Sequence, residues 1–144
     1  MSDAYLSNPN LKKIGINIEF TKEQVEEYIK CAKDPIYFVK NYMKIIHVDK
    51  GLIPFDLYDY QEKMITNFND ERFVITKMPR QSGKSTAVIS FILHYILFNE
   101  SKNVALLANK AELARELLDR LKKAYENLPL WLQQGITVWN KGSI

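Results

Sequence analysis

The sequence is poor in the residues and runs that mark several protein classes. Its single cysteine, Cys31, excludes an internal disulfide and fits a reducing compartment. No apolar run reaches the roughly 18 residues that a membrane span needs, because Ser90 and His94 interrupt the densest one. The polar N-terminus lacks the pattern of a signal peptide. These features favour a protein that works in reducing surroundings and away from membranes.

Charge and composition exclude little more. The net charge of +3 is too small to indicate a nucleic-acid partner by itself. His47 and His94 have no metal-ligand partners near them in the sequence, so we expect both to pack as ordinary side chains. Hydrophobic residues make up 47% of the 144-residue chain and charged residues 26%, which is typical of one globular domain with a real core.

The chain divides into three predicted parts. Residues 1–20 are expected to be extended or loosely ordered. Residues 21–56 read as a helical and hairpin lead-in: Thr21 and Gln24 form a capping box, and Asp34 caps a second helix. A hairpin is expected, with Ile45–Val48 and Leu52–Phe55 on either side of residues 49–51. Residues 57–144 then alternate between strand-like and helix-like patterns.

This alternation predicts an α/β fold with a parallel sheet and flanking helices, the core of a P-loop NTPase. The last predicted helix is amphipathic, and the helix that begins near Lys84 is apolar almost all round. The predicted strands are Phe73–Thr76, Asn103–Ala108 and Ile136–Trp139. The predicted helices are residues 58–69, the helix that begins near Lys84, and residues 111–127.

The segment FVITKMPRQSGKST, residues 73–86, has the layout of a phosphate-binding loop. A short β-rich run enters a turn, and Gly83 precedes a long helix whose first N–H groups can bind anions. Lys84 is expected to reach the β- and γ-phosphates of ATP, and Ser85 to offer its hydroxyl to Mg²⁺. Met78 stands where the usual first glycine would be. The plainer interpretation is a helix N-terminus with a serine in its first turn.

Tyr60 and Gln61 lie ahead of this loop. A glutamine amide both donates and accepts, so Gln61 is a candidate reader of the adenine edge, and an aromatic ring can stack on the base. The alternative is a capped helix start with Tyr60 in the core.

Arg80 lies inside the loop, three residues before Gly83. Its permanent charge can stabilise the γ-phosphoryl group during transfer, acting in cis. A salt bridge to Asp59 or Glu62 is an equally good interpretation of this arginine.

From about Asn8 onward, the chain resembles the N-terminal part of the large terminase subunit of tailed bacteriophages, most closely those of large contractile-tailed phages. In that family the phosphate loop commonly lacks its first glycine and carries an Arg-Gln pair. The segments that carry the resemblance are Asn10-Leu11-Lys12, Glu26-Glu27 with Lys30-Cys31, Asp59-Tyr60-Gln61, MPRQSGKST, Leu118-Asp119-Arg120 and WNKGSI.

The resemblance implies a motor that uses ATP and Mg²⁺ to pump double-stranded viral DNA into a procapsid. It implies a ring of subunits at the portal protein, a small terminase subunit as partner, and work in the host cytoplasm. The residues it assigns are Lys84 and Arg80 to catalysis, Ser85 to the metal, and Tyr60, Gln61, Arg80, Gln81, Ser82, Gly83, Lys84, Ser85 and Thr86 to the nucleotide.

No hydrophobic strand ending in Asp-Glu occurs in the sequence, so the acidic Walker B pair that such ATPases need is missing. We therefore expect an N-terminal piece, truncated before that strand, that binds nucleotide poorly and hydrolyses little alone. Three alternatives stay open at this point: a superfamily 2-like helicase or translocase fragment, a small-molecule kinase, and a non-enzymatic module that completes another chain.

Overall fold

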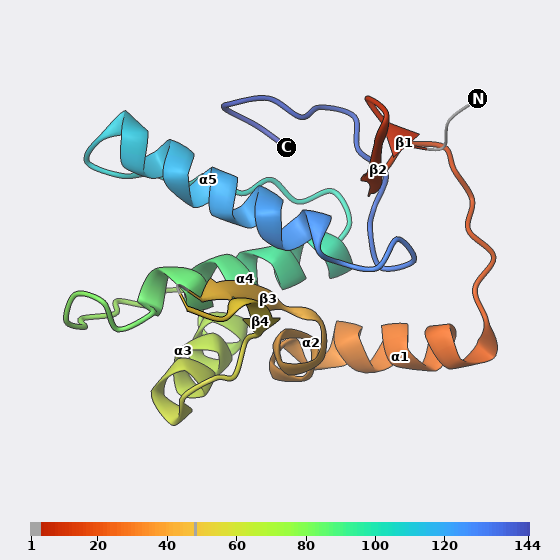
Figure 1. The fold of residues 1–144 in the computed structure, drawn as a ribbon. Coiled ribbons are helices and arrows are strands. Elements are labelled where there is room, and N and C mark those ends of the chain that lie inside the picture. The colour runs from red at the N-terminus through yellow and green to blue at the C-terminus, as the bar shows by residue number, and fades with distance from the viewer. Residues whose placement is uncertain (1–3, 48) are drawn as a thin grey trace.

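The computed structural model describes residues 4–47 and 49–144, which form five helices and two antiparallel strand pairs. Helix α4 lies between α5 and α3, and the β3–β4 hairpin lies beside α2 (Figure 1). The elements are β1 (Ala4–Tyr5), β2 (Asn8–Lys12), α1 (Lys22–Lys33), α2 (Pro35–Tyr42), β3 (Lys44–His47), β4 (Gly51–Pro54), α3 (Asp59–Asp70), α4 (Lys84–Phe98) and α5 (Ala111–Glu126).

The core is built around α4. This helix contacts α2, α3 and α5, which explains why its sequence is apolar on nearly every face. Its side chains Ile89 and Leu93 are almost completely buried, and Phe38 of α2 and Ile65 of α3 are buried with them. Packing on three sides fixes the direction of α4, and therefore the position of its N-terminus.

The predicted capping signals are confirmed. The Thr21 hydroxyl accepts the Gln24 N–H at 3.2 Å, and the Gln24 side chain accepts the Thr21 N–H at 3.1 Å. The Asp34 carboxylate accepts the N–H groups of Ile36 and Tyr37 at 2.8 and 3.1 Å. These side chains satisfy donors that a helix start leaves unpaired, so α1 and α2 begin where the sequence predicts.

The predicted hairpin is also present. Strand β3 pairs with β4 in antiparallel register, from Lys44 opposite Pro54 to His47 opposite Gly51. Val48, which the prediction also placed in this hairpin, lies outside the described residues.

The predicted parallel sheet is wrong for the part of the chain that the structure describes. Phe73–Thr76 and Asn103–Ala108 are irregular, and Ile136 makes only a single parallel bridge, with Lys13. Ile75 is 99% exposed and Leu107 is 92% exposed, so neither side chain packs against a neighbouring strand. An alternating apolar pattern favours an extended backbone, but a sheet forms only where a second segment supplies the hydrogen bonds.

The start of the described chain is more ordered than the sequence predicts. Strands β1 and β2 pair with each other, and β2 then contacts the C-terminal segment. The Ile136 N–H donates to the Lys12 carbonyl at 2.9 Å, and the Lys12 N–H donates to the side-chain oxygen of Gln133 at 3.1 Å. These hydrogen bonds join residues that are more than a hundred positions apart.

None of the described helices is both long and apolar enough to cross a bilayer.

His94 is a buried polar group in the core of α4. Its Nε2 lies 2.8 Å from the Cys31 carbonyl, which can only accept, so Nε2 carries the hydrogen. Burial lowers the pKa of His94 from its ordinary value of 6.5, and the hydrogen bond to Cys31 opposes this shift only in part. The folded chain therefore holds this imidazole in its neutral form.

We predict that the free energy of unfolding decreases as the pH is lowered through 6.5, the ordinary pKa of this histidine. Below that pH the unfolded chain takes up a proton at His94 that the folded chain resists. The contribution of His94 to the free energy of unfolding is therefore fully present above pH 6.5 and is lost on acidification. Urea unfolding between pH 7 and pH 5 measures this. His94→Gln retains a donor for the Cys31 carbonyl and should show a smaller decrease, whereas parallel curves for the two proteins would contradict the assignment.

Candidate phosphate-binding site

In the loop that leads into α4, two residues have a left-handed backbone conformation, which favours glycine. Gly83 is the N-cap of α4 with φ of 71°, and Gln81 has φ of 60°. A Cβ atom at position 83 would lie 2.5 Å from Nε2 of Gln61. Two features favour glycine at position 83, its backbone conformation and the close approach of the Gln61 side chain.

The start of α4 presents donors to an anion. The Ala87 N–H donates to the Gly83 carbonyl at 3.1 Å, which opens the helical hydrogen-bond series. The preceding N–H groups of the first turn have no partner within the helix, and the helix dipole favours negative charge at this end. Ser85 and Thr86 are half-buried in this turn.

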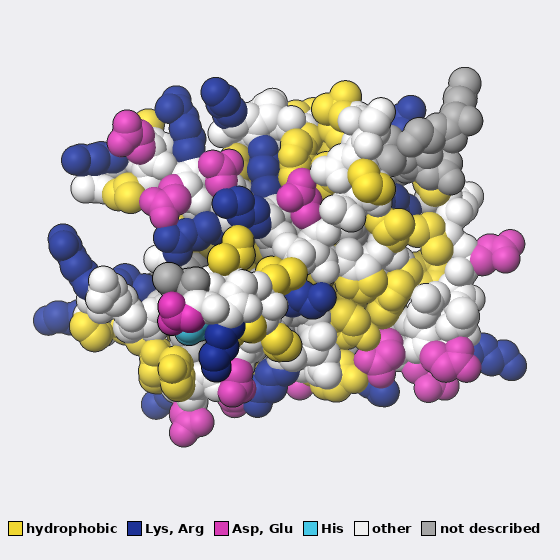
Figure 2. Space-filling view, in the orientation of Figure 1, with side chains coloured by type: hydrophobic (Ala, Val, Ile, Leu, Met, Phe, Trp, Pro, Cys, Tyr) yellow, Lys and Arg dark blue, Asp and Glu magenta, His cyan; other side chains and the backbone are white. Residues whose placement is uncertain are grey.

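The loop also carries positive charge. Residues 72–84 contain Arg72, Lys77, Arg80 and Lys84 and no acidic residue. On the side of the molecule where α5 begins and where the chain enters α4, many Lys and Arg side chains are exposed, with Asp and Glu side chains among them (Figure 2). The loop itself, with four basic side chains and no acidic one, attracts polyphosphate.

Lys84 folds back across the loop. Its Nζ donates to the Pro79 carbonyl at 3.1 Å, and the Ser82 hydroxyl donates to the same carbonyl at 3.0 Å. The ammonium therefore lies over the turn, at an exposed position. Sequence reasoning missed Pro79, since a carbonyl acceptor leaves no signal in the residue type.

Tyr60 and Gln61 lie against the loop. The Tyr60 hydroxyl donates to the Ser82 carbonyl at 2.8 Å, and Gln61 Nε2 lies 3.5 Å from the same oxygen. The ring of Tyr60 stacks on that of Tyr58 with centroids 5.5 Å apart. Tyr60 is 42% exposed, so it lies outside the core. Tyr58 is a further residue of this region that the sequence did not single out.

Arg80 and Gln81 lie at the exposed tip of the loop. Glu62, one of the two acids considered as a partner for Arg80, pairs instead with Lys40 at 2.5 Å. Among the described residues no salt bridge joins Arg80 to Asp59 or Glu62. The guanidinium is free to turn toward a ligand at the loop.

The described residues contain no group of three or more His, Cys, Asp or Glu side chains that would hold a metal ion. Mg²⁺ bound with a nucleotide does not need such a group, because phosphate oxygens and water supply most of its ligands. A single hydroxyl in the first turn of α4, that of Ser85, suits this role.

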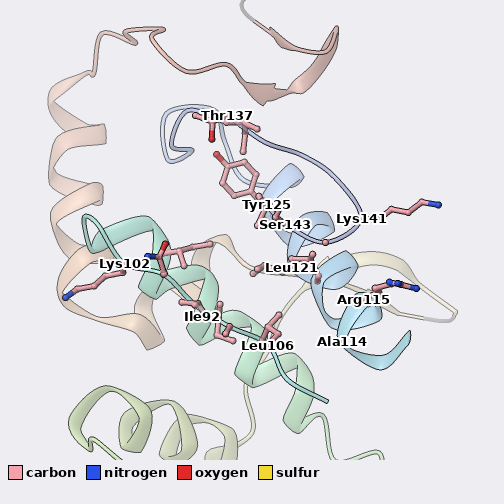
Figure 3. Close-up of a pocket in the computed structure, with 18 of the residues that line it drawn as sticks. Ile92, Lys102, Leu106, Ala114, Arg115, Leu121, Tyr125, Thr137, Lys141 and Ser143 are labelled. Carbon is pink, nitrogen blue, oxygen red and sulfur yellow. The ribbon is translucent and has the colours of Figure 1, made fainter. Parts of the chain in front are cut away.

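A separate cavity of about 820 Å³ lies between α4, α5 and the irregular segments beside them (Figure 3). Apolar side chains such as Ile92, Leu106 and Leu121 line it, and Lys102, Arg115 and Lys141 lie at its margin. Its size does not make it the nucleotide site, because phosphate recognition needs the N–H groups and lysine of the loop at Gly83.

Comparison with protein families supports the interpretation of the loop. Residues 75–144 match the family model described as terminase large subunit, T4likevirus-type, N-terminal. The match includes the MPRQSGKST segment and confirms the predicted resemblance over residues 75–144. Tyr60, Gln61 and the segments before them that carry the resemblance precede the matched residues. Residues 75–144 therefore belong to the N-terminal region of the terminase large subunit family of the T4likevirus type, which is part of the phage DNA-packaging ATPase.

Proposed function

We propose that the loop from Pro79 to Thr86 binds the triphosphate of ATP. The N–H groups of Gln81, Ser82 and Gly83 and of the first turn of α4 surround the phosphates. Lys84 contacts the β- and γ-phosphates as a point charge. The hydroxyl of Ser85 ligates the Mg²⁺ that accompanies the nucleotide.

One observation carries this proposal: Lys84 Nζ lies 3.1 Å from the Pro79 carbonyl, across the turn that Gly83 closes. The ammonium is already held on the loop by a neutral acceptor. A phosphate oxygen carries a full charge and makes a stronger hydrogen bond than a carbonyl does. A polyphosphate can therefore displace Pro79 as the partner of Lys84 without a rearrangement of α4.

We further propose that this ATP site serves a DNA-packaging motor. The support is the family of residues 75–144, together with the basic side chains around the loop. In this function the partners are double-stranded viral DNA, the portal protein, the small terminase subunit and further copies of the large subunit. The division of the chain into residues 1–20, an N-terminal lead-in of residues 21–56 and the ATPase portion of residues 57–144 also belongs to this proposal.

Calorimetric titration of the 144-residue chain with ATP, with and without Mg²⁺, tests the binding step. The proposal requires saturable binding of one ATP that Mg²⁺ strengthens. Tripolyphosphate should compete for the same site, since the loop recognises phosphate. Absence of competition would place the nucleotide elsewhere.

Arg80 is proposed to act on the reaction and not on binding. In the complete packaging ATPase, Arg80→Ala should leave ATP affinity nearly unchanged and reduce turnover by about 1,000-fold or more, the usual effect of losing an arginine that stabilises phosphoryl transfer. Single-turnover hydrolysis and equilibrium binding separate the two effects. Arg72→Ala is the matched control. The guanidinium carbon of Arg72 lies 5.1 Å from the centre of the Phe73 ring, so this arginine packs on its neighbour. Equal loss of affinity and turnover in Arg80→Ala would indicate a structural role.

A further inference from the structure

Two side chains from the first turn of α3 converge on one carbonyl of the loop. The Tyr60 hydroxyl donates to the Ser82 oxygen at 2.8 Å, and Gln61 Nε2 lies 3.5 Å from it. Ser82 is the residue directly before Gly83, the N-cap of α4. The contact therefore holds one defined peptide group, that between Ser82 and Gly83.

The amide of Gln61 is already engaged within the protein. Its Oε1 accepts the Tyr58 N–H at 3.0 Å, and its Nε2 faces the Ser82 carbonyl and lies 2.5 Å from the place that a Cβ on Gly83 would take. The side chain is only 1% exposed. An amide in this position has no free edge to offer a nucleobase.

The geometry of the peptide group gives this contact a consequence for phosphate binding. The Ser82–Gly83 peptide is trans, so the Ser82 carbonyl and the Gly83 N–H point in opposite directions. Holding the carbonyl toward α3 directs the Gly83 N–H to the other side of the loop. Rotation of this peptide would replace a donor with a carbonyl oxygen, which repels phosphate.

We propose that Tyr60 and Gln61 are positioning residues that fix the Ser82–Gly83 peptide, so that the Gly83 N–H faces the phosphates. This inference rests on the proposed function and reassigns the two residues from reading the base to orienting the loop. Tyr60 acts through its hydroxyl, and its ring is supported by Tyr58, whose plane is inclined to it by only 12°. Gln61 acts through its Nε2, which faces the Ser82 carbonyl.

Tyr60→Phe removes the hydroxyl and keeps the stacked ring. We expect it to weaken ATP, GTP and tripolyphosphate by the same factor, about 3- to 10-fold, because one hydrogen bond to the loop is lost. Tyr58→Phe is the matched control and should change none of the three affinities. A base-reading role would instead weaken ATP alone and leave tripolyphosphate unchanged, and that result would overturn the proposal.

NMR of the isotopically labelled chain without ligand separates this inference from the proposed function. The carbonyl-carbon signal of Ser82 and the amide signal of Gly83 should shift in Tyr60→Phe relative to the native chain and to Tyr58→Phe, because the Ser82 carbonyl loses a hydrogen bond, while signals from the middle of α4 stay the same. If the native chain bound no polyphosphate but this difference were seen, the phosphate site would be rejected and the positioning contact retained. Unchanged signals of Ser82 and Gly83 in Tyr60→Phe would overturn the positioning role.

Discussion

Replacing Lys84 with alanine is expected to cause a large loss of triphosphate binding. Lys84 holds the ammonium at the loop, 3.1 Å from the Pro79 carbonyl, where a phosphate oxygen can replace that acceptor. A hydrogen bond between charged groups contributes more than a neutral one, so removal should weaken ATP by about 10- to 100-fold. Calorimetry or competition with tripolyphosphate measures the change.

The control for this variant is Lys63→Ala. Lys63 is an exposed lysine of α3, so its removal changes the net charge by the same amount without touching the loop. Only Lys84→Ala should lose affinity, and the unfolding transitions of the two variants should coincide. Retention of native ATP affinity by Lys84→Ala would remove the assignment of this segment as a phosphate loop.

Gly83→Ala is expected to damage both the fold and the site. The backbone at this position has φ of 71°, which costs a residue with a Cβ roughly 1–3 kcal/mol. The added atom would also lie 2.5 Å from Gln61 Nε2. Gln61 is buried and hydrogen-bonded, so it cannot move aside without losing its bond to the Tyr58 N–H. Urea unfolding should show the loss of stability, and nucleotide affinity should fall with it.

Gly142→Ala provides the matched control for that substitution. A Cβ atom there meets only the side-chain oxygen of Asn140, at 3.7 Å, which is an ordinary contact. We expect it to be close to native in stability and in ATP binding. If Gly83→Ala were equally mild, the loop would tolerate a different backbone conformation, and the close packing of α3 beneath it would not be required.

The features that the sequence predicted well depend on nearby residues. The caps at Thr21 and Asp34 satisfy donors within three positions of themselves, so residue type and spacing identify them. The burial of α4 follows from its apolar composition. The proposed phosphate loop is likewise a short segment, and Gly83 and Lys84 occupy the N-cap and the first helical residue of α4, where the sequence places the turn and the start of the helix.

The features that the sequence missed depend on partners far away in the chain. The pattern of Phe73–Thr76 favours an extended backbone, but nothing in it identifies a neighbouring strand, and Ile75 remains exposed. The contact of Tyr60 with Ser82 joins residues 22 positions apart and uses a backbone oxygen. The attachment of β2 to Ile136 spans most of the chain. Contacts of these kinds are settled by tertiary packing and leave no local signal.

The central claim is that the turn at Gly83 and the first turn of α4 bind polyphosphate. Titration of the isotopically labelled chain with Mg²⁺ and ATP, followed by amide NMR, tests it residue by residue. We predict that the largest shift changes occur at the amides of residues 81–86 and that tripolyphosphate reproduces them. Changes confined to the cavity between α4 and α5, with residues 81–86 unaffected, would contradict the claim.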